Sequence, residues 1–206
     1  EKVETVMTTS LITAQDPISP EDARAVMVSN KIEKLPLVKD GQLTGLMTLR
    51  DITQTDKFPL ANTDSEGHLR VAAAAGTDAS TEGRVNDLVK AGVDVVVIDT
   101  AHGHSSRVIE TAQRVRKDYP DLQLIVGNIA TAAAARDLLD IGVDAIKVGI
   151  GPGSICTTRV VAGVGAPQLS AIMDVFSVTR NTGVPIIADG GIRHSGDAVK
   201  ALAAGA

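Results

Sequence analysis

The stretch AAAARDLLDIGVDAIKV, residues 132–148, decides the fold because it contains a helix, a glycine turn and a buried strand in succession. Residues 132–141 have a helical pattern, and Gly142 suits the left-handed position that ends a helix. Residues 145–148 form a short apolar strand. Related junctions recur as AGVD at 91–94 and TGVP at 182–185. This self-similarity predicts repeats of one βα unit, as in a (β/α)8 TIM barrel.

The same alternation continues on both sides of this stretch. Predicted strands cover 71–75, 93–98, 122–126, 145–148 and 185–188, and predicted helices cover 81–91, 106–117, 132–141, 168–181 and 195–204. Continuous apolar strands separated by helices predict a parallel sheet that is buried on both faces. Five strands make an incomplete barrel, since eight are needed. A doubly wound sheet is the alternative.

The N-terminal segment has a different pattern. Ser19 is placed to cap a helix that starts at Pro20. Two short strands, 35–38 and 43–48, flank an Asp40–Gly41 pair that is typical of a hairpin turn. Residues 53–69 are polar and contain proline and glycine, so they are expected to form a linker or surface loop.

Composition excludes several classes of protein. The 206 residues carry a net charge of −5 at a pI near 5.3, which argues against a nucleic-acid partner. A single cysteine, Cys156, excludes an internal disulfide. No apolar run is long enough for a membrane span, and the first residues do not resemble a signal peptide. We therefore expect a cytoplasmic protein.

The richest chemical motif is GIGPGSICTTR at 149–159, directly after the 145–148 strand. In a barrel this position lies at the carboxyl-terminal face, where active sites are built. Cys156 there is a candidate thiolate nucleophile, and the alternative is an inert, buried small residue. The loop's carbonyls could bind a monovalent cation, and its amides with the Ser154 hydroxyl could bind phosphate.

Three other strand ends carry polar residues. In the 187–193 motif, Asp189 could hold a ribose diol and the Gly190–Gly191 amides a phosphate, or Asp189 could only cap the next helix. The 98–104 motif could bind a second ligand such as a cofactor ribose. Its two histidines lack a third metal ligand at a recognisable spacing. In the 127–131 motif, Asn128 could bind a ligand or Thr131 could simply cap a helix.

These motifs resemble the IMP dehydrogenase and GMP reductase family. The resemblance rests on 149–159 followed by GVGAPQ at 163–168, on DGGIR at 189–193 with SGD at 195–197, and on DTAHGH at 99–104. At the N-terminus, VMT at 6–8, IEKLP at 32–36 and TLRD at 48–51 resemble the second repeat of a CBS regulatory module. The resemblance implies a partial CBS domain at 1–52, a linker at 53–69 and a partial TIM-barrel catalytic domain at 70–206.

The resemblance also implies a reaction and a set of site residues. Cys156 would attack C2 of IMP, hydride would pass to NAD, and water would release XMP, with Thr158 beside the thiol. Implied substrate-binding residues are Ser154, Asp189, Gly190, Gly191 and Asn128. Implied cofactor-binding residues are Asp99, Thr100, Ala101, Gly149 and Gly151. Backbone carbonyls of Gly151, Gly153 and Cys156 would coordinate K⁺.

The sequence departs from the family pattern in several places. The mobile flap with its Arg–Tyr pair, the first CBS repeat, the remaining barrel strands and a partner subunit's K⁺-site segment have no counterpart among these 206 residues. The resemblance implies a homotetramer, and an adenine or guanine nucleotide near Thr48 and Asp51. Two alternatives stay open: an NADPH-dependent GMP reductase, and a nucleotide-sensing module without turnover. The strand at 187–189 and the CBS-like segment favour the dehydrogenase over the reductase.

Overall fold

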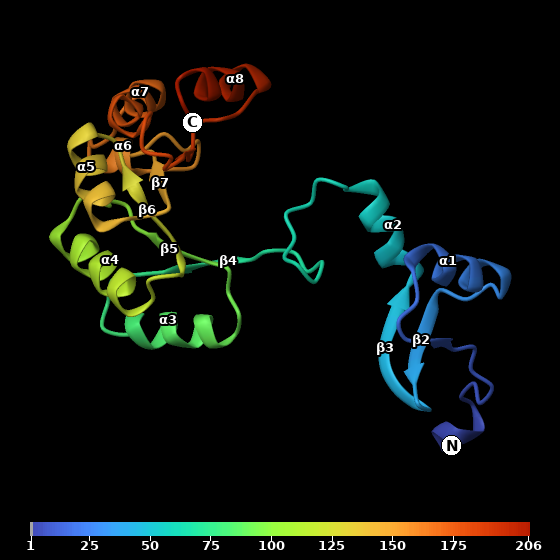
Figure 1. Ribbon diagram of the computed structural model, residues 1–206. Helices are drawn as coiled ribbons and strands as arrows, with labels where there is room; N and C mark the ends of the chain where they lie inside the picture. Colours follow the sequence, from blue (N-terminus) through green and yellow to red (C-terminus); the bar gives the residue numbers. More distant parts are fainter. Residues whose placement is uncertain (1) are drawn as a thin grey trace. The chain divides into compact units, whose positions relative to one another are not determined.

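The computed structural model describes residues 2–206, and the chain divides into two compact units. The first unit extends to Leu69, and the second runs from Arg70 to Ala206 (Figure 1). Each unit has its own hydrophobic core.

The first unit is a small α/β structure. Its elements are η1 (Val3–Thr5), β1 (Ala14–Gln15), α1 (Pro20–Ser29), β2 (Lys34–Lys39), β3 (Gln42–Thr48) and α2 (Leu49–Lys57). Strand β2 pairs in parallel with β1 and antiparallel with β3. Its core consists of four buried side chains, Ala23, Met27, Leu35 and Ile52.

The predicted helix cap and the predicted hairpin turn of this unit are both confirmed. The Ser19 hydroxyl accepts a hydrogen bond from the amide of Asp22 and caps α1. Asp40 and Gly41 both have positive φ, 51° and 78°, as a hairpin turn of the type I′ class requires.

The expectation that residues 53–69 form a linker is wrong for the first five residues, which belong to α2. The helix is polar along most of its length, so its composition resembles that of a loop. Ile52 is buried, the hydroxyl of Thr53 bonds back to the Leu49 carbonyl, and Asp56 pairs with Arg24 of α1. These contacts stabilise a helix that composition alone does not indicate.

The second unit alternates strands and helices. Its strands are β4 (Ala72–Ala75), β5 (Val95–Asp99), β6 (Gln123–Ile129), β7 (Ala145–Val148) and β8 (Ile186–Ala188). Its helices are α3 (Thr81–Lys90), α4 (Ser106–Asp118), α5 (Ala132–Ile141), α6 (Thr158–Val161), α7 (Gln168–Thr179) and α8 (Ser195–Ala203). The short α6 was not predicted.

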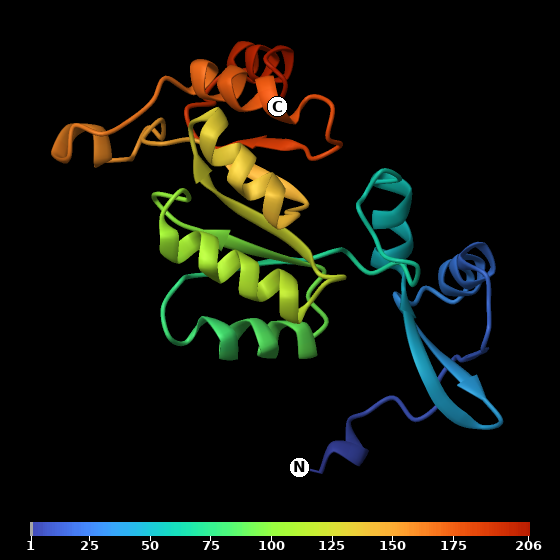
Figure 2. The ribbon, with the colours of Figure 1, turned by 60° about the vertical axis from the view of Figure 1, so that its left-hand side comes forward.

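All five strands are parallel and follow one another in chain order, from β4 to β8 (Figures 1 and 2). A doubly wound sheet reverses its strand order at a switch point, and residues 70–206 contain no such reversal. Right-handed crossovers that always advance in one direction place the helices on one face of the sheet. Neighbouring helices accordingly pack in sequence, α4 on α5, α5 on α7 and α7 on α8. This is the arrangement of a (β/α)8 barrel segment.

The glycines of the repeated helix–strand junctions share one backbone conformation. Gly92, Gly142 and Gly183 have φ values of 82°, 83° and 79°, which only glycine adopts without strain. In the first two junctions an aspartate follows, and its Oδ2 accepts a backbone amide at 2.7 Å from the start of the preceding strand or the residue just before it. Asp94 bonds the amide of Val71, and Asp144 that of Leu124.

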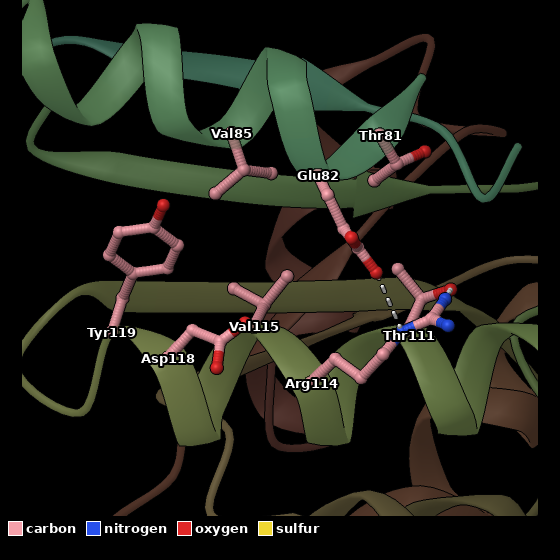
Figure 3. A pocket seen from close by; sticks show the side chains of 8 residues that line it. All are labelled: Thr81, Glu82, Val85, Thr111, Arg114, Val115, Asp118 and Tyr119. Carbon is pink, nitrogen blue, oxygen red and sulfur yellow. Dashed lines mark hydrogen bonds and ion pairs between the residues drawn. The ribbon is translucent and has the colours of Figure 1, made fainter. Parts of the chain in front are cut away.

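A small cavity of about 30 Å³ lies between α3 and α4 (Figure 3). Glu82 and Arg114 form an ion pair of 3.4 Å across it, and Thr81 Oγ1 is buried there without a partner among residues 2–206. The volume suits about one water molecule, so this is a packing feature of the helix layer. None of the helices formed by residues 2–206 has the length and apolarity needed to cross a membrane.

Candidate active site

A cavity of about 400 Å³ lies at the carboxyl ends of β5, β6, β7 and β8, and we call it the strand-end cavity. Its size is within the range of small-molecule sites. Its lining comprises Asp99, Thr100, Ala101, Asn128, Gly149, Ile150, Gly151, Pro152, Gly153, Cys156, Thr158, Asp189 and Gly190. Thus the structure brings together residues from four motifs that the sequence separates. Two expected substrate-binding residues, Ser154 and Gly191, do not line it.

The loop after β7 is pressed against the end of β8. A Cβ atom on Gly149 would lie 2.1 Å from the Asp189 carbonyl oxygen, so this position requires glycine. A Cβ on Gly190 would lie 3.0 Å from the Pro152 ring and 3.1 Å from the Gly153 nitrogen. Gly191 lies beside the same proline, and Ser154 is exposed. The glycines therefore allow two backbones to form one wall of the cavity.

Cys156 is half-buried in this wall and has a chemically distinct environment. Its Sγ lies 3.3 Å from the Thr158 hydroxyl oxygen, and Thr158 is the first residue of α6. The hydroxyl and amide of Thr158, aided by the charge of Arg159, lower the pKa of the Cys156 thiol below its usual 9.0 despite an opposing effect of burial. A lowered pKa increases the thiolate population, which is the nucleophilic form. Cys156 is not fully buried, which differs from the buried position that the inert alternative describes.

Asp189 takes part in the cavity and does not cap a helix. Helix α8 is capped by His194, with Asp197 accepting the backbone amides of Arg193 and His194. The Oδ2 of Asp189 instead accepts a 2.7 Å hydrogen bond from the Asn128 amide.

The side chain of Asn128 in β6 forms hydrogen bonds with the residues that directly follow β7 and β8. Its Nδ2 donates to the Gly149 carbonyl at 2.9 Å and to Asp189, and only 9% of the residue is exposed. Its Oδ1 is buried without a hydrogen-bond partner among residues 2–206. Thr131 caps α5 in addition, since its hydroxyl accepts the amide of Ala134. The capping role of Thr131 is therefore confirmed, and ligand binding by Asn128 stays a prediction.

The loop after β5 is fastened to β6 by backbone bonds. Thr100 donates its amide and its hydroxyl to the Gly127 carbonyl and accepts the Asn128 amide. Gly103 donates to the Asn128 carbonyl at 2.7 Å, and His104 contacts Asp137 of α5 at 2.7 Å. No group of three or more His, Cys, Asp or Glu side chains within residues 2–206 could hold a metal ion.

Sequence reasoning missed one residue beside the strand-end cavity, Lys147. Its Nζ lies 3.1 Å from Asp99 Oδ1 and 3.1 Å from Asp189 Oδ2. Burial lowers the pKa of Lys147, but the two carboxylates outweigh it and raise that pKa above its usual 10.5. A signal was available, because a lysine inside the apolar strand AIKV is costly to bury without a charged partner.

The chain is similar in sequence to a known family and to several named proteins. The IMP dehydrogenase / GMP reductase domain matches residues 20–206. Inosine-5′-monophosphate dehydrogenase of Aquifex aeolicus is 56% identical over 96% of this chain, which spans 40% of that protein. The Staphylococcus aureus protein of the same name is also 56% identical, over 99% of this chain and 42% of its own length. The chain therefore spans about two fifths of these curated relatives.

Solved structures also match over the whole chain. A cysteine-to-alanine variant of GMP reductase from Trypanosoma brucei is 44% identical, with a TM-score of 0.85, over 100% of this chain and 48% of its own. The same variant in complex with guanosine 5′-monophosphate matches equally well over 99% of this chain and 44% of its own. A GMP reductase thus has a counterpart of residues 1–69, which overturns the expectation that this segment favours the dehydrogenase. Taken with the domain match, these likenesses show that the chain belongs to the IMP dehydrogenase / GMP reductase family.

Proposed function

We propose that the protein oxidises IMP to XMP with NAD as hydride acceptor, through a covalent intermediate on Cys156. The observation that carries the proposal is the strand-end cavity, in which a thiol of lowered pKa faces the same space as Asp99, Asn128 and Asp189. The named dehydrogenases at 55–56% identity support this reaction over others of the family.

The chemistry at Cys156 follows from its surroundings. The Thr158 hydroxyl stabilises the thiolate, which attacks C2 of the hypoxanthine ring and forms a C–S bond. When bound, NAD⁺ accepts the hydride that leaves C2. A water molecule then adds to C2, the thiolate leaves, and XMP is released with one proton. Cys156 is thus regenerated, and the overall change is IMP, NAD⁺ and water to XMP, NADH and a proton.

Polar atoms around the thiol suit a nucleotide. Asp189 Oδ1 accepts no bond from residues 2–206 and can accept the ribose hydroxyls of IMP, while the Gly190 amide is placed for its phosphate. We keep Ser154 and Gly191 as proposed phosphate contacts, although they lie outside the cavity lining. The buried, unpartnered Oδ1 of Asn128 requires a donor, which a ligand hydroxyl or amide would supply.

The residues on the β5 side fit the cofactor. Asp99 Oδ2 accepts no bond from residues 2–206, and it lies with Thr100, Ala101, Gly149 and Gly151 around the same cavity. We propose that Asp99 binds the nicotinamide ribose hydroxyls there. The shared cavity would hold the two reacting rings together and exclude bulk water.

The glycine loop also fits a monovalent cation. The carbonyls of Gly151 and Cys156 accept no hydrogen bond from residues 2–206, and that of Gly153 accepts only the Cys156 amide. Three such carbonyls suit K⁺, whose charge would favour the neighbouring thiolate. The homotetramer, a nucleotide on a CBS-type N-terminal unit and a cytoplasmic location stay predictions.

The GMP reductase reaction is the second candidate, favoured by the two Trypanosoma brucei structures. It would use the same cysteine but reduce GMP with NADPH and release ammonia. Purified full-length protein should be supplied with IMP and NAD⁺ in one assay and with GMP and NADPH in another. We expect NADH and XMP from the first mixture only. IMP and ammonia from the second mixture, without NADH from the first, would assign the reductase reaction.

A further inference from the structure

The cavity contains two carboxylates that share one cation. Asp99 ends β5 and Asp189 follows β8, and these are the two outer strands of the four whose ends line the strand-end cavity. Lys147 of β7 contacts both at 3.1 Å, and its side chain is 18% exposed whereas each carboxylate is 45% exposed. The ammonium group is therefore the buried centre of a three-residue charge network, and the carboxylates are its accessible ends.

The strand register and a glycine in β6 allow the Lys147 side chain to extend to Asp99. Asp99, Gly127 and Lys147 are register neighbours across β5, β6 and β7, so Lys147 must extend over β6 to meet Asp99. A Cβ on Gly127 would lie 2.5 Å from Lys147 Cβ and 2.6 Å from its carbonyl oxygen. A residue with any side chain at 127 would therefore displace the lysine. Gly127 therefore leaves the space in which the Lys147 side chain reaches both Asp99 and Asp189.

Among residues 2–206, one oxygen of each of the two carboxylates contacts other residues of the protein and the other oxygen does not. Asp99 uses Oδ1 for Lys147, and Asp189 uses Oδ2 for Lys147 and Asn128. The other oxygen of each carboxylate accepts no bond from residues 2–206. Fixing one oxygen on a cation orients the remaining oxygen, and it also offsets the repulsion between two anions in one cavity.

We propose that Lys147 is a positioning residue that orients Asp99 and Asp189 together, and so couples the binding of the two ligands that these carboxylates hold. This rests on the proposed function, in which Asp189 binds the nucleotide ribose and Asp99 the cofactor ribose. Because ordering one carboxylate also orders the lysine, the first ligand to bind prepares the site of the second. Lys147 itself contacts neither reacting atom.

The test compares three variants of the full-length protein. Asp189→Asn should raise the IMP Kd, Asp99→Asn should raise the NAD KM, and Lys147→Met should raise both by about 10-fold or more, as expected for loss of charge-assisted hydrogen bonds. Lys147→Arg should restore both values to within a few-fold. Lys117→Met, which removes an exposed lysine of α4, is the matched control and should change neither.

A pH profile separates positioning from simple loss of packing. The Asn128 hydrogen bond and, after it, Lys147 lower the pKa of Asp189, so removal of the lysine should move the acidic limb of kcat/KM for IMP to higher pH. If Lys147→Met does not fold, Lys147→Gln carries the same comparison. An effect on only one ligand, or an unmoved acidic limb, would overturn the inference. Absence of IMP turnover in the unmodified protein would instead contradict the proposed function.

Discussion

The family resemblance implies nucleotide-binding roles for two sets of polar residues, and the structure gives the two sets different surroundings. In the first unit, Thr48 and Asp51 bond each other, with 2.6 Å between the hydroxyl and the carboxylate, and the Asp51 amide bonds Thr48 Oγ1 at 3.1 Å. This is the geometry of a capped helix start, and both of these bonds are local to it. In the second unit, Asp99 and Asp189 line the strand-end cavity and are held by the half-buried Lys147, and one oxygen of each carboxylate has no partner among residues 2–206.

The contrast between these two sets distinguishes polar residues that stabilise the fold from polar residues that can bind a ligand. A polar side chain whose partners are all local stabilises its own element. A polar side chain that is fixed by a distant partner, and still has an unpaired atom in a cavity, is prepared for a ligand. We therefore expect changes in the second set to affect turnover and changes in the first set to affect stability.

The largest expected effect is that of Cys156→Ala. Without the nucleophile, formation of XMP from IMP and NAD⁺ should fall by more than about 1,000-fold, since covalent catalysis is lost. The thermal unfolding temperature should stay unchanged, because the thiol is only half-buried. Steady-state assay of NADH checks the first expectation and calorimetry the second. Substantial remaining turnover would show that Cys156 is not the nucleophile.

Asp189→Asn should have the next largest effect. Removal of the charge should weaken IMP binding by about 100-fold, through lost charge-assisted bonds to the ribose. The Asn128 hydrogen bond, helped by Lys147 and opposed by burial, holds the pKa of Asp189 below 3.8. The binding and stability that the ionised group contributes should therefore be complete above pH 3.8 and decline as the pH falls through the lowered pKa. Calorimetric titration with IMP at several pH values measures both; an unchanged Kd in the variant would remove Asp189 from the site.

Thr158→Val should have a smaller effect that appears in the reactivity of the thiol. Losing the hydroxyl should raise the pKa of Cys156 towards 9.0 and reduce turnover several-fold at neutral pH. The rate of alkylation by iodoacetamide as a function of pH reports the thiol pKa directly. Thr157→Val is the matched control, because the Thr157 hydroxyl makes no capping bond. Identical alkylation profiles for Thr158→Val and the unmodified protein would contradict this assignment.

The smallest expected effect is that of Thr48→Ala in the first unit. Loss of the cap of α2 should cost about 1 kcal/mol of stability in that unit and leave the IMP KM unchanged. Thr48→Ser, which keeps the hydroxyl, should restore most of the stability. Urea unfolding followed by circular dichroism measures the difference. A fall in affinity for adenine or guanine nucleotides without loss of stability would show that Thr48 binds a ligand and would break the comparison.

Much of the fold could be predicted because its determinants are local. Gly142 ends α5 in the left-handed conformation, Ser19 and Thr131 cap their helices, and the apolar runs match the strands closely. The cavity could also be anticipated, since parallel strands bring their carboxyl ends to one edge.

What could not be predicted depends on contacts between distant residues. Lys147 was overlooked because its role arises only when β5, β7 and β8 are placed in register. The short helix α6 is missing from the prediction because Thr158–Val161 is rich in β-branched residues. Residues 53–57 look like a loop because their helix is supported mainly by burial of Ile52 and by the Arg24–Asp56 pair.

The central claim is that Cys156 forms a covalent bond with a nucleotide held by the polar residues that line the strand-end cavity. Intact mass spectrometry of the full-length protein, quenched in acid during turnover of IMP with NAD⁺, tests it most directly. We predict an added mass equal to that of IMP less two hydrogens, which are the hydride given to NAD⁺ and the proton lost by the thiol. The added mass should be located on Cys156 by peptide mapping, absent from Cys156→Ala, and accompanied by NADH. NADH formation without any nucleotide attached to Cys156, from protein quenched at several times within the first turnover, would contradict the account.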